Sequence, residues 1–166
     1  MLNRKQVLRM HLAVSGMLAL VLTSAAWAQS SKQPDLRIQA LSAQPGKPSV
    51  YEIAFTTREA LSPEAEFTLE FPTEFDLSHL QIAGSPEMTG GFTLAREKQT
   101  VLVKRSGLGQ RVAFGTFVRL RLGSIGNPKN FAGSTEVTLQ VRASAQSAAA
   151  AFAKQRVTFQ ATEKRE

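Results

Sequence analysis

Apolar and polar residues alternate with a period of two along most of the chain beyond residue 35. In residues 49–57 (SVYEIAFTT), Tyr51, Ile53 and Phe55 fall on one face of an extended chain, and Glu52 falls on the other. The same alternation recurs, strongly or weakly, in residues 36–41, 66–71, 92–96, 101–104, 112–114, 117–122, 135–142 and 157–161. Successive side chains of a strand point to opposite faces of its sheet, so this pattern predicts about eight or nine short strands.

Turn-forming residues separate the alternating segments. They include Pro45-Gly46, Gly90-Gly91, Gly107 and Asn127-Pro128. Two stretches lack the alternation: residues 76–80 (DLSHL) predict one short helical turn, and the alanine-rich residues 144–154 predict a loop or a short helix before the last strand. Many short strands with a turn after each are typical of an antiparallel β-sandwich, which is the fold class that we expect.

The first 28 residues have the pattern of a cleavable signal peptide. A basic start containing Arg4, Lys5 and Arg9 precedes an apolar run over residues 12–23, and Ala26-Trp27-Ala28 supplies a small-x-small cleavage site. The predicted organisation is therefore a signal peptide at residues 1–28, a linker at 29–35, a β-sandwich domain at 36–161 and a charged tail at 162–166. We expect the protein to be exported, to the periplasm or the extracellular space.

Three short motifs follow one another in an order that resembles a known module. They are FTT at residues 55–57, FP-x-x-F at residues 71–75, and G-N-P followed by a glycine at residues 126–133. Over residues 50–141 the chain is similar to the immunoglobulin-like β-sandwich module of prokaryotic exported and surface proteins. The resemblance implies an immunoglobulin-like unit used for display, spacing or adhesion, without catalysis. The residues that carry it are Pro72, Phe75, Gly126, Asn127, Pro128 and Gly133.

Turn formation is sufficient to explain these motif residues. Pro72 has no N–H to donate to a sheet, so it must end a strand or lie on an edge. Asn127 precedes Pro128 and is therefore kept away from helical geometry, while the glycines allow a tight loop. The motifs predict structure rather than chemistry.

The composition offers little for catalysis. The chain has no cysteine, which excludes disulfides, thiolate metal sites and a cysteine nucleophile. His79 follows Asp76 by three residues, but no nucleophile motif accompanies the pair. Beyond residue 28 the chain contains one tyrosine, Tyr51, and no tryptophan. We therefore expect no enzymatic activity, no cofactor and no metal site, and leave open a weak Ca²⁺ site at Glu74 and Asp76.

Charge is distributed unevenly along the chain, whose formal net charge is +7. Residues 29–90 carry 4 basic and 9 acidic residues, net −5, whereas residues 91–166 carry 13 and 4, net +9. A candidate face for an anion or a partner consists of five nearby cations: Lys104, Arg105, Arg111, Arg119 and Arg121. The alternative is that the basic strands pair with acidic strands within one sheet, where opposite charges stabilise cross-strand neighbours.

These observations favour a non-enzymatic, exported structural or interaction module that acts in surface binding, adhesion or assembly. Its expected partner is another envelope or surface protein, or a second copy of the chain. The alternative is a periplasmic protein that binds an anionic envelope polysaccharide or lipid through its basic strands. Nucleic acid is not an expected partner, because an exported chain of this composition lacks a stacking platform.

Cleavage of the signal peptide predicts that the exported protein begins at Gln29. Intact-mass analysis of protein recovered from the envelope or the medium checks this expectation. A mass that includes Met1 would contradict it.

Overall fold

The computed structural model describes residues 35–131, 135–152 and 154–159, which form ten strands and no helix. The signal peptide, most of the linker and the charged tail predicted above lie outside the described residues. The strands are β1 (Leu36–Ala40), β2 (Pro48–Thr56), β3 (Glu66–Glu70), β4 (Ile82–Gly84), β5 (Phe92–Glu97), β6 (Thr100–Arg105), β7 (Phe117–Gly126), β8 (Glu136–Arg142), β9 (Ala150–Ala151) and β10 (Gln155–Phe159). Within this part of the chain, no helix is long and apolar enough to cross a membrane.

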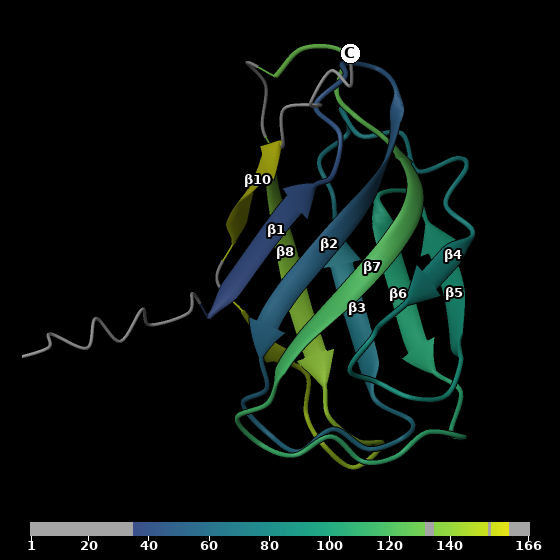
Figure 1. Cartoon of the computed structure of the whole chain (residues 1–166), viewed down its shortest axis with the longest axis vertical. Coiled ribbons are helices and arrows are strands. Elements are labelled where there is room, and N and C mark those ends of the chain that lie inside the picture. Colours follow the sequence, from purple (N-terminus) through teal and green to yellow (C-terminus); the bar gives the residue numbers. More distant parts are fainter. Residues whose placement is uncertain (1–34, 132–134, 153, 160–166) are drawn as a thin grey trace, which may run out of the picture. The chain divides into compact units, whose positions relative to one another are not determined.

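The strands form two layers that are joined by the last strand (Figure 1). One layer runs in the order β4-β7-β2-β1, and the other in the order β8-β3-β6-β5, with β9 also paired to β8. β10 pairs with β1 on one side, where Ile38 faces Val157, and with β8 on the other, where Gln155 faces Val137. The sandwich is therefore continuous along the β10 side and ends at β4 and β5 on the opposite side.

The expectation of a wholly antiparallel sandwich is wrong at one pair of strands. β1 and β10 are parallel, whereas the other paired strands are antiparallel. A parallel pair requires the chain to cross over between its two strands, and here most of the domain lies between them. The alternation within a segment carries no information about the direction of its partner, so the sequence pattern could not reveal this pair.

One face of each long strand is buried between the layers, as the alternation predicted. β2 contributes Tyr51, Ile53 and Phe55, and the ring of Phe55 lies 5.9 Å from that of Phe67 on β3 in the facing layer. Further inward residues of the long strands include Ile38, Leu69, Val101, Val103, Val118, Leu120, Leu122, Ile125, Val137, Leu139, Val141 and Val157. The buried area of these side chains is the main favourable contribution to the stability of a domain without disulfides.

Residues 112–114 were expected to form a strand and do not. Val112 makes only an isolated bridge to Leu61, and Phe114 is exposed. The backbone of this segment bonds to a neighbouring loop rather than to a strand ladder. The apolar-x-apolar pattern is therefore present, but the two side chains are not buried together.

The two segments without alternation also differ from their expected forms. Residues 76–80 contain a hydrogen-bonded turn, closed by the Leu80 N–H to the Leu77 carbonyl at 3.1 Å, and no helix. The alanine-rich segment contains a turn at residues 144–147 and then β9, a two-residue strand. β4 was not expected, because three residues are too few to show a period.

Leu139 and Thr138 on β8 test the assignment of the two faces. Leu139 is buried and pairs with Leu69 inside the sandwich, so Leu139→Ala is expected to cost about 2–5 kcal/mol of unfolding free energy. Thr138 faces outward, so Thr138→Ala should cost less than about 1 kcal/mol. Chemical denaturation of the two variants measures the difference, and equal losses would contradict the register of β8.

Candidate interaction surfaces

The FP-x-x-F motif lies at one end of the sandwich, where it ends β3 and covers the core. Pro72 lies two residues after the end of β3, and its carbonyl accepts hydrogen bonds from the Phe75 N–H and the Gln99 side chain. Phe75 is buried, with its ring 5.8 Å from that of Tyr51 and 5.5 Å from that of Phe71. Both motif residues serve the fold.

The G-N-P motif closes the same end. The Tyr51 hydroxyl donates to Asn127 Oδ1 at 2.5 Å, and Asn127 Nδ2 donates to the carbonyls of Ser42 and Gln44. Burial raises the pKa of the Tyr51 phenol above its ordinary value. Gly126 bonds reciprocally with the backbone of Asp76, and a Cβ at Gly126 would lie 2.8 Å from the Asp76 Cβ.

The other two members of the motif add no chemistry to this end. Pro128 is buried, and its carbonyl accepts a hydrogen bond from the Gly46 N–H at 3.3 Å. Gly133 lies outside the described residues. The placed members of the motif therefore hold a loop to the core.

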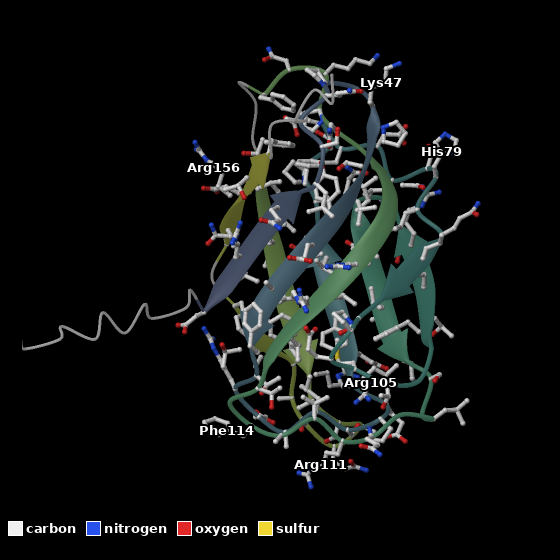
Figure 2. The ribbon with its side chains drawn as sticks, in the orientation of Figure 1. Lys47, His79, Arg105, Arg111, Phe114 and Arg156 are labelled. Atoms are coloured by element: carbon white, nitrogen blue, oxygen red, sulfur yellow. The ribbon has the colours of Figure 1, made fainter. Side chains whose placement is uncertain are left out.

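The candidate catalytic pair is not assembled. His79 is exposed (Figure 2), and the Asp76 carboxylate accepts a hydrogen bond from the Ser78 N–H at 2.9 Å. The hydrogen bonds from Ser78 hold the pKa of Asp76 below its ordinary value, with a smaller contribution from the charge of His79. Glu74 and Asp76 border an open hollow with Asn127 and Lys129, but in the described part of the chain no three potential metal ligands converge.

The five cations of the candidate anion face do not share a surface. Lys104 lies on the outer face of the β8-β3-β6-β5 layer, whereas Arg119 and Arg121 lie on the outer face of the β4-β7-β2-β1 layer. Arg111 lies on the loop between β6 and β7, at the lower end in Figure 2. The prediction that Arg105 belongs to such a face is wrong, because its side chain is only 1% exposed.

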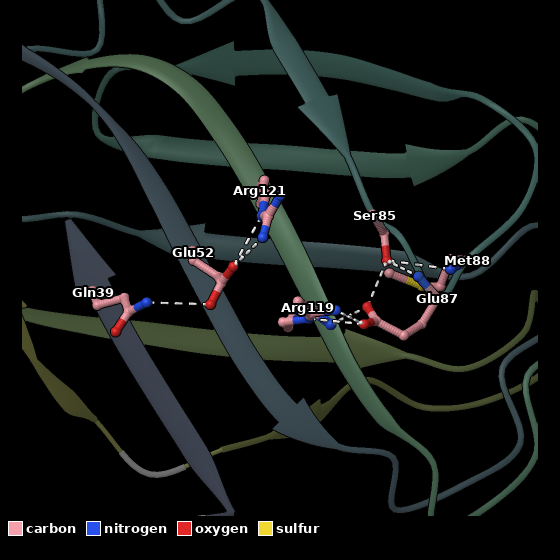
Figure 3. Close-up of polar contacts among 7 residues, drawn as sticks. All are labelled: Gln39, Glu52, Ser85, Glu87, Met88, Arg119 and Arg121. Carbon is pink, nitrogen blue, oxygen red and sulfur yellow. Dashed lines mark hydrogen bonds and ion pairs between the residues drawn. The ribbon is translucent and has the colours of Figure 1, made fainter. Parts of the chain in front are cut away.

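Three of these cations are paired with acids from the first half of the chain, and for two of them, Lys104 and Arg121, the pair joins neighbouring strands. Glu66 on β3 lies 3.3 Å from Lys104 on β6 and 3.4 Å from Arg142 on β8. Glu52 on β2 lies 2.9 Å from Arg121 on the neighbouring β7, and Gln39 on β1 bonds to the other oxygen of Glu52 (Figure 3). Acidic and basic strands therefore interleave, which was the alternative to a basic face.

Arg119 makes more hydrogen bonds to its acid than the other cations of these pairs. It holds the Glu87 carboxylate through Nε at 2.8 Å, through Nη2 at 2.6 Å, and through its backbone N–H at 2.9 Å (Figure 3). Burial would raise the pKa of Glu87, but the hydrogen bonds and charge of Arg119 outweigh it and lower the pKa. The pair fixes the 85–91 segment to β7, with Met88 buried beside it.

Arg105 is directed inward because it continues the inward positions of Val101 and Val103 on β6. Its guanidinium donates to three carbonyls: Ser62 and Gln110 at 2.6 Å, and Thr89 at 3.2 Å. Its Nε has no partner among the described residues, and burial lowers the pKa of the group although nearby Glu64 opposes the shift. One buried cation thus joins three loops at the end of the sandwich opposite the Asn127 turn.

The 106–116 loop is held along its first half by this cluster. The Gly107 N–H donates to the Pro63 carbonyl at 3.0 Å, and the Gln110 N–H donates to Thr89 Oγ1 at 3.0 Å. Gly109 is packed so closely that a Cβ would lie 1.9 Å from the Thr89 carbonyl oxygen. A side chain at this position would push the loop away from its neighbour.

The second half of the loop is held by the segment that follows β2. Val112 and Leu61 exchange backbone hydrogen bonds at 2.9 and 3.0 Å. Thr57 accepts from Gly115 at its carbonyl, donates from its hydroxyl to the Ala113 carbonyl at 2.7 Å, and receives the Thr116 N–H at Oγ1. The loop backbone is therefore fixed on both sides of its tip.

The side chains of this fixed loop are nevertheless directed into solvent. Leu108 is 87% exposed and Phe114 is 73% exposed, the two highest values among the large apolar side chains of the described residues. Arg111 lies between them, is exposed, and has no hydrogen bond or ion pair within the described part of the chain. Aromatic residues and arginine are enriched at protein–protein interfaces, and a backbone that is already ordered lowers the entropic cost of binding.

No protein-family model matches the chain, and no curated protein matches it. Among solved structures, the chain is similar to the N-terminal domain of the Streptococcus gordonii adhesin Sgo0707, with 15% identity and a TM-score of 0.48. That match covers 77% of this chain and 33% of the chain of the adhesin domain, so this chain spans about a third of the length of that domain.

Two further solved structures are similar over most of their own length. An uncharacterized protein from Nocardia farcinica with an immunoglobulin-like fold is 15% identical, with a TM-score of 0.43 and 70% and 81% of the two chains covered. ACE19, the collagen binding subdomain of the Enterococcus faecalis surface protein ACE, is 6% identical, with a TM-score of 0.43 and 76% and 96% covered. The two-layer arrangement of this chain follows from its own strand pairing.

Arg105 and Arg111 allow a matched test of the buried cation. Arg105→Met leaves the carbonyls of Ser62, Thr89 and Gln110 without their donor, so we expect a loss of at least about 2 kcal/mol of unfolding free energy. Arg111→Met removes an exposed and unpaired charge, and should change the stability by less than about 0.5 kcal/mol. Denaturant unfolding of both variants measures this, and similar values would show that Arg105 does not anchor the loops.

Proposed function

We propose that the chain is an exported, non-enzymatic interaction module that binds another envelope or surface protein through its 106–116 loop. The observation that carries this proposal is the combination of a fixed backbone and unburied apolar side chains. A loop that is already ordered loses little conformational entropy on binding, so Leu108, Arg111 and Phe114 are presented at low cost.

The charges around the loop support a protein partner over an anionic surface. Arg111 and Arg58 at this end are accompanied by exposed Glu59 and Glu64, so the end carries both signs. A membrane-binding or polysaccharide-binding end would be expected to concentrate cations. The cations that the alternative function would need are instead distributed over separate faces and paired with acids.

Export is supported by the basic start, apolar run and cleavage site of residues 1–28. The absence of catalysis is supported by the composition: two histidines, no cysteine, and no nucleophile motif.

Photo-crosslinking in the cells that make the protein tests the proposal. Phe114 is replaced by the photoreactive analogue p-benzoylphenylalanine, which keeps the aromatic ring exposed at the loop tip. The control carries the same analogue in place of Phe131, which is 37% exposed, stacks on Phe159 and lies beyond the far end of the ten-residue strand β7. We expect a discrete protein adduct from position 114 and none from position 131.

Second-site changes connect the adduct to the loop surface. Leu108→Ser should lower the yield of the position-114 adduct at least about tenfold if this side chain is part of the contact. The thermal midpoint of Leu108→Ser should change little, because the Leu108 side chain is 87% exposed. An adduct that is unaffected by Leu108→Ser, or equal yields at positions 114 and 131, would refute binding through this loop.

A further inference from the structure

The side of the sandwich opposite β10 ends in two strands that are not paired to each other. β4 hydrogen-bonds only to β7, and β5 only to β6, among the described strands. β5 is the longer edge, with six residues, FTLARE, and contains neither proline nor glycine. An edge strand of this kind presents free backbone groups that can pair with another strand.

The register shows which backbone groups of β5 face away from β6. Ser106 donates its N–H to the Gly91 carbonyl at 2.9 Å, so Gly91 and Ser106 form a hydrogen-bonded pair of the antiparallel ladder. Such pairs alternate along a ladder. Thr93, Ala95 and Glu97 therefore direct their N–H and C=O groups toward β6, and Phe92, Leu94 and Arg96 direct theirs away from it. The same alternation holds on the other side of β6, where Arg105 bonds to Ala65.

The side chains of this edge are incompletely covered. Phe92 and Leu94 pack against the core but remain partly exposed, because no strand lies beyond β5 in its sheet. Thr93 and Ala95 alternate with them on the outer face and are small. The edge thus lacks both the backbone partners and the apolar cover that a neighbouring strand would supply.

We propose that β5 pairs with β5 of a second copy, antiparallel about a two-fold axis at Leu94. This axis places Leu94 opposite Leu94 of the second copy, and Phe92 opposite Arg96 of the second copy. In this register, Phe92, Leu94 and Arg96 each pair with a residue whose backbone groups also face away from β6. An axis at Thr93 or Ala95 would match only two of them within the strand, so the axis at Leu94 makes the most hydrogen bonds.

The side chains are compatible with this register. The two Leu94 side chains cover each other at the centre, and Thr93 of one copy lies beside Ala95 of the other on the outer face. The two Arg96 residues are four residues apart along the joined strands, roughly 14 Å, so that like charges do not meet. Each Arg96 instead faces Phe92 of the other copy, a pairing of cation and aromatic ring that is favourable.

The two segments outside the described domain that remain after the predicted signal-peptide cleavage do not fit the edge. Residues 29–34 (QSSKQP) and 160–166 (QATEKRE) lack the alternating apolar residues that would cover Phe92 and Leu94. β5 itself has these residues at the required spacing, which favours a second copy as the occupant. A heterologous partner strand is then an outcome that the experiment distinguishes.

Amide hydrogen exchange of the exported protein, followed residue by residue at about 10 µM and about 1 mM, tests the register. A small interface is expected to bind weakly, which is why the higher concentration is needed. We expect the N–H groups of Phe92, Leu94 and Arg96 to gain at least about tenfold protection at the higher concentration. Those of Thr93, Ala95 and Glu97 should be protected equally at both concentrations, because they bond to β6 within one copy.

Matched variants separate pairing from folding, with sedimentation velocity as the readout. Leu94→Lys places a charge in the pairing face and should leave only monomer at about 1 mM, whereas Thr93→Lys adds the same charge on the outer face and should leave the dimer. Should Leu94→Lys lower the thermal midpoint, Arg96→Pro provides the second test, because the N–H that it removes is not used by β6. It should abolish the dimer without unfolding the domain.

A monomer at every concentration would overturn the proposal, and would leave the β5 edge to a strand of a different protein. A dimer without new protection at Phe92, Leu94 and Arg96 would also overturn it, because the two copies would then meet elsewhere. The result is independent of the 106–116 loop. Phe114→Ser should leave the dimer unchanged, so failure of strand pairing and failure of the proposed function can be told apart.

Discussion

β10 forms hydrogen bonds with one strand of each layer, and this double pairing determines the geometry of the sandwich. Its parallel bonds to β1 and antiparallel bonds to β8 make the two layers continuous on one side. The apolar faces are thereby held against each other, with Phe55 of one layer on Phe67 of the other. The same connection leaves both unpaired edges, β4 and β5, together on the opposite side. The pairing of β10 thus determines both where the core lies and where the edge strands β4 and β5 lie.

The two ends of the sandwich are closed by polar groups that belong to the interior. At one end, Asn127 uses its whole amide to bind Tyr51 and two backbone carbonyls. At the other, Arg105 binds carbonyls from three loops. A buried polar group is costly unless it is hydrogen-bonded, so each of these residues favours a single arrangement of the chain around it. This is how the 106–116 loop can keep Leu108 and Phe114 in solvent without collapsing onto the core.

The strands could be predicted from the sequence because a strand with one buried face has an apolar residue at every second position, and this pattern is visible within a short segment. The pairing of the strands could not, since it depends on segments far apart: the parallel β1–β10 pair and the two-residue β9 leave no local pattern. Arg105 shows a signal that was missed, because it occupies the inward position after Val101 and Val103, whereas Lys104 occupies the outward one. The grouping of cations by sequence proximity failed for the same reason, as neighbouring residues of a strand lie on opposite faces.

The pairing of the first strand with the last also governs when the domain can form. The carbonyl of Ile38 on β1 receives the hydroxyl of Thr158 on β10, a contact across 120 positions. Proteins dominated by such distant contacts fold slowly, because a long loop must be closed before the contact is gained. β1 can pair with β2 early, but its second partner, β10, is available only when nearly the whole domain has been made. During synthesis from the N-terminus, the strands of each layer can pair among themselves, but the two layers stay unjoined until β10 has left the ribosome.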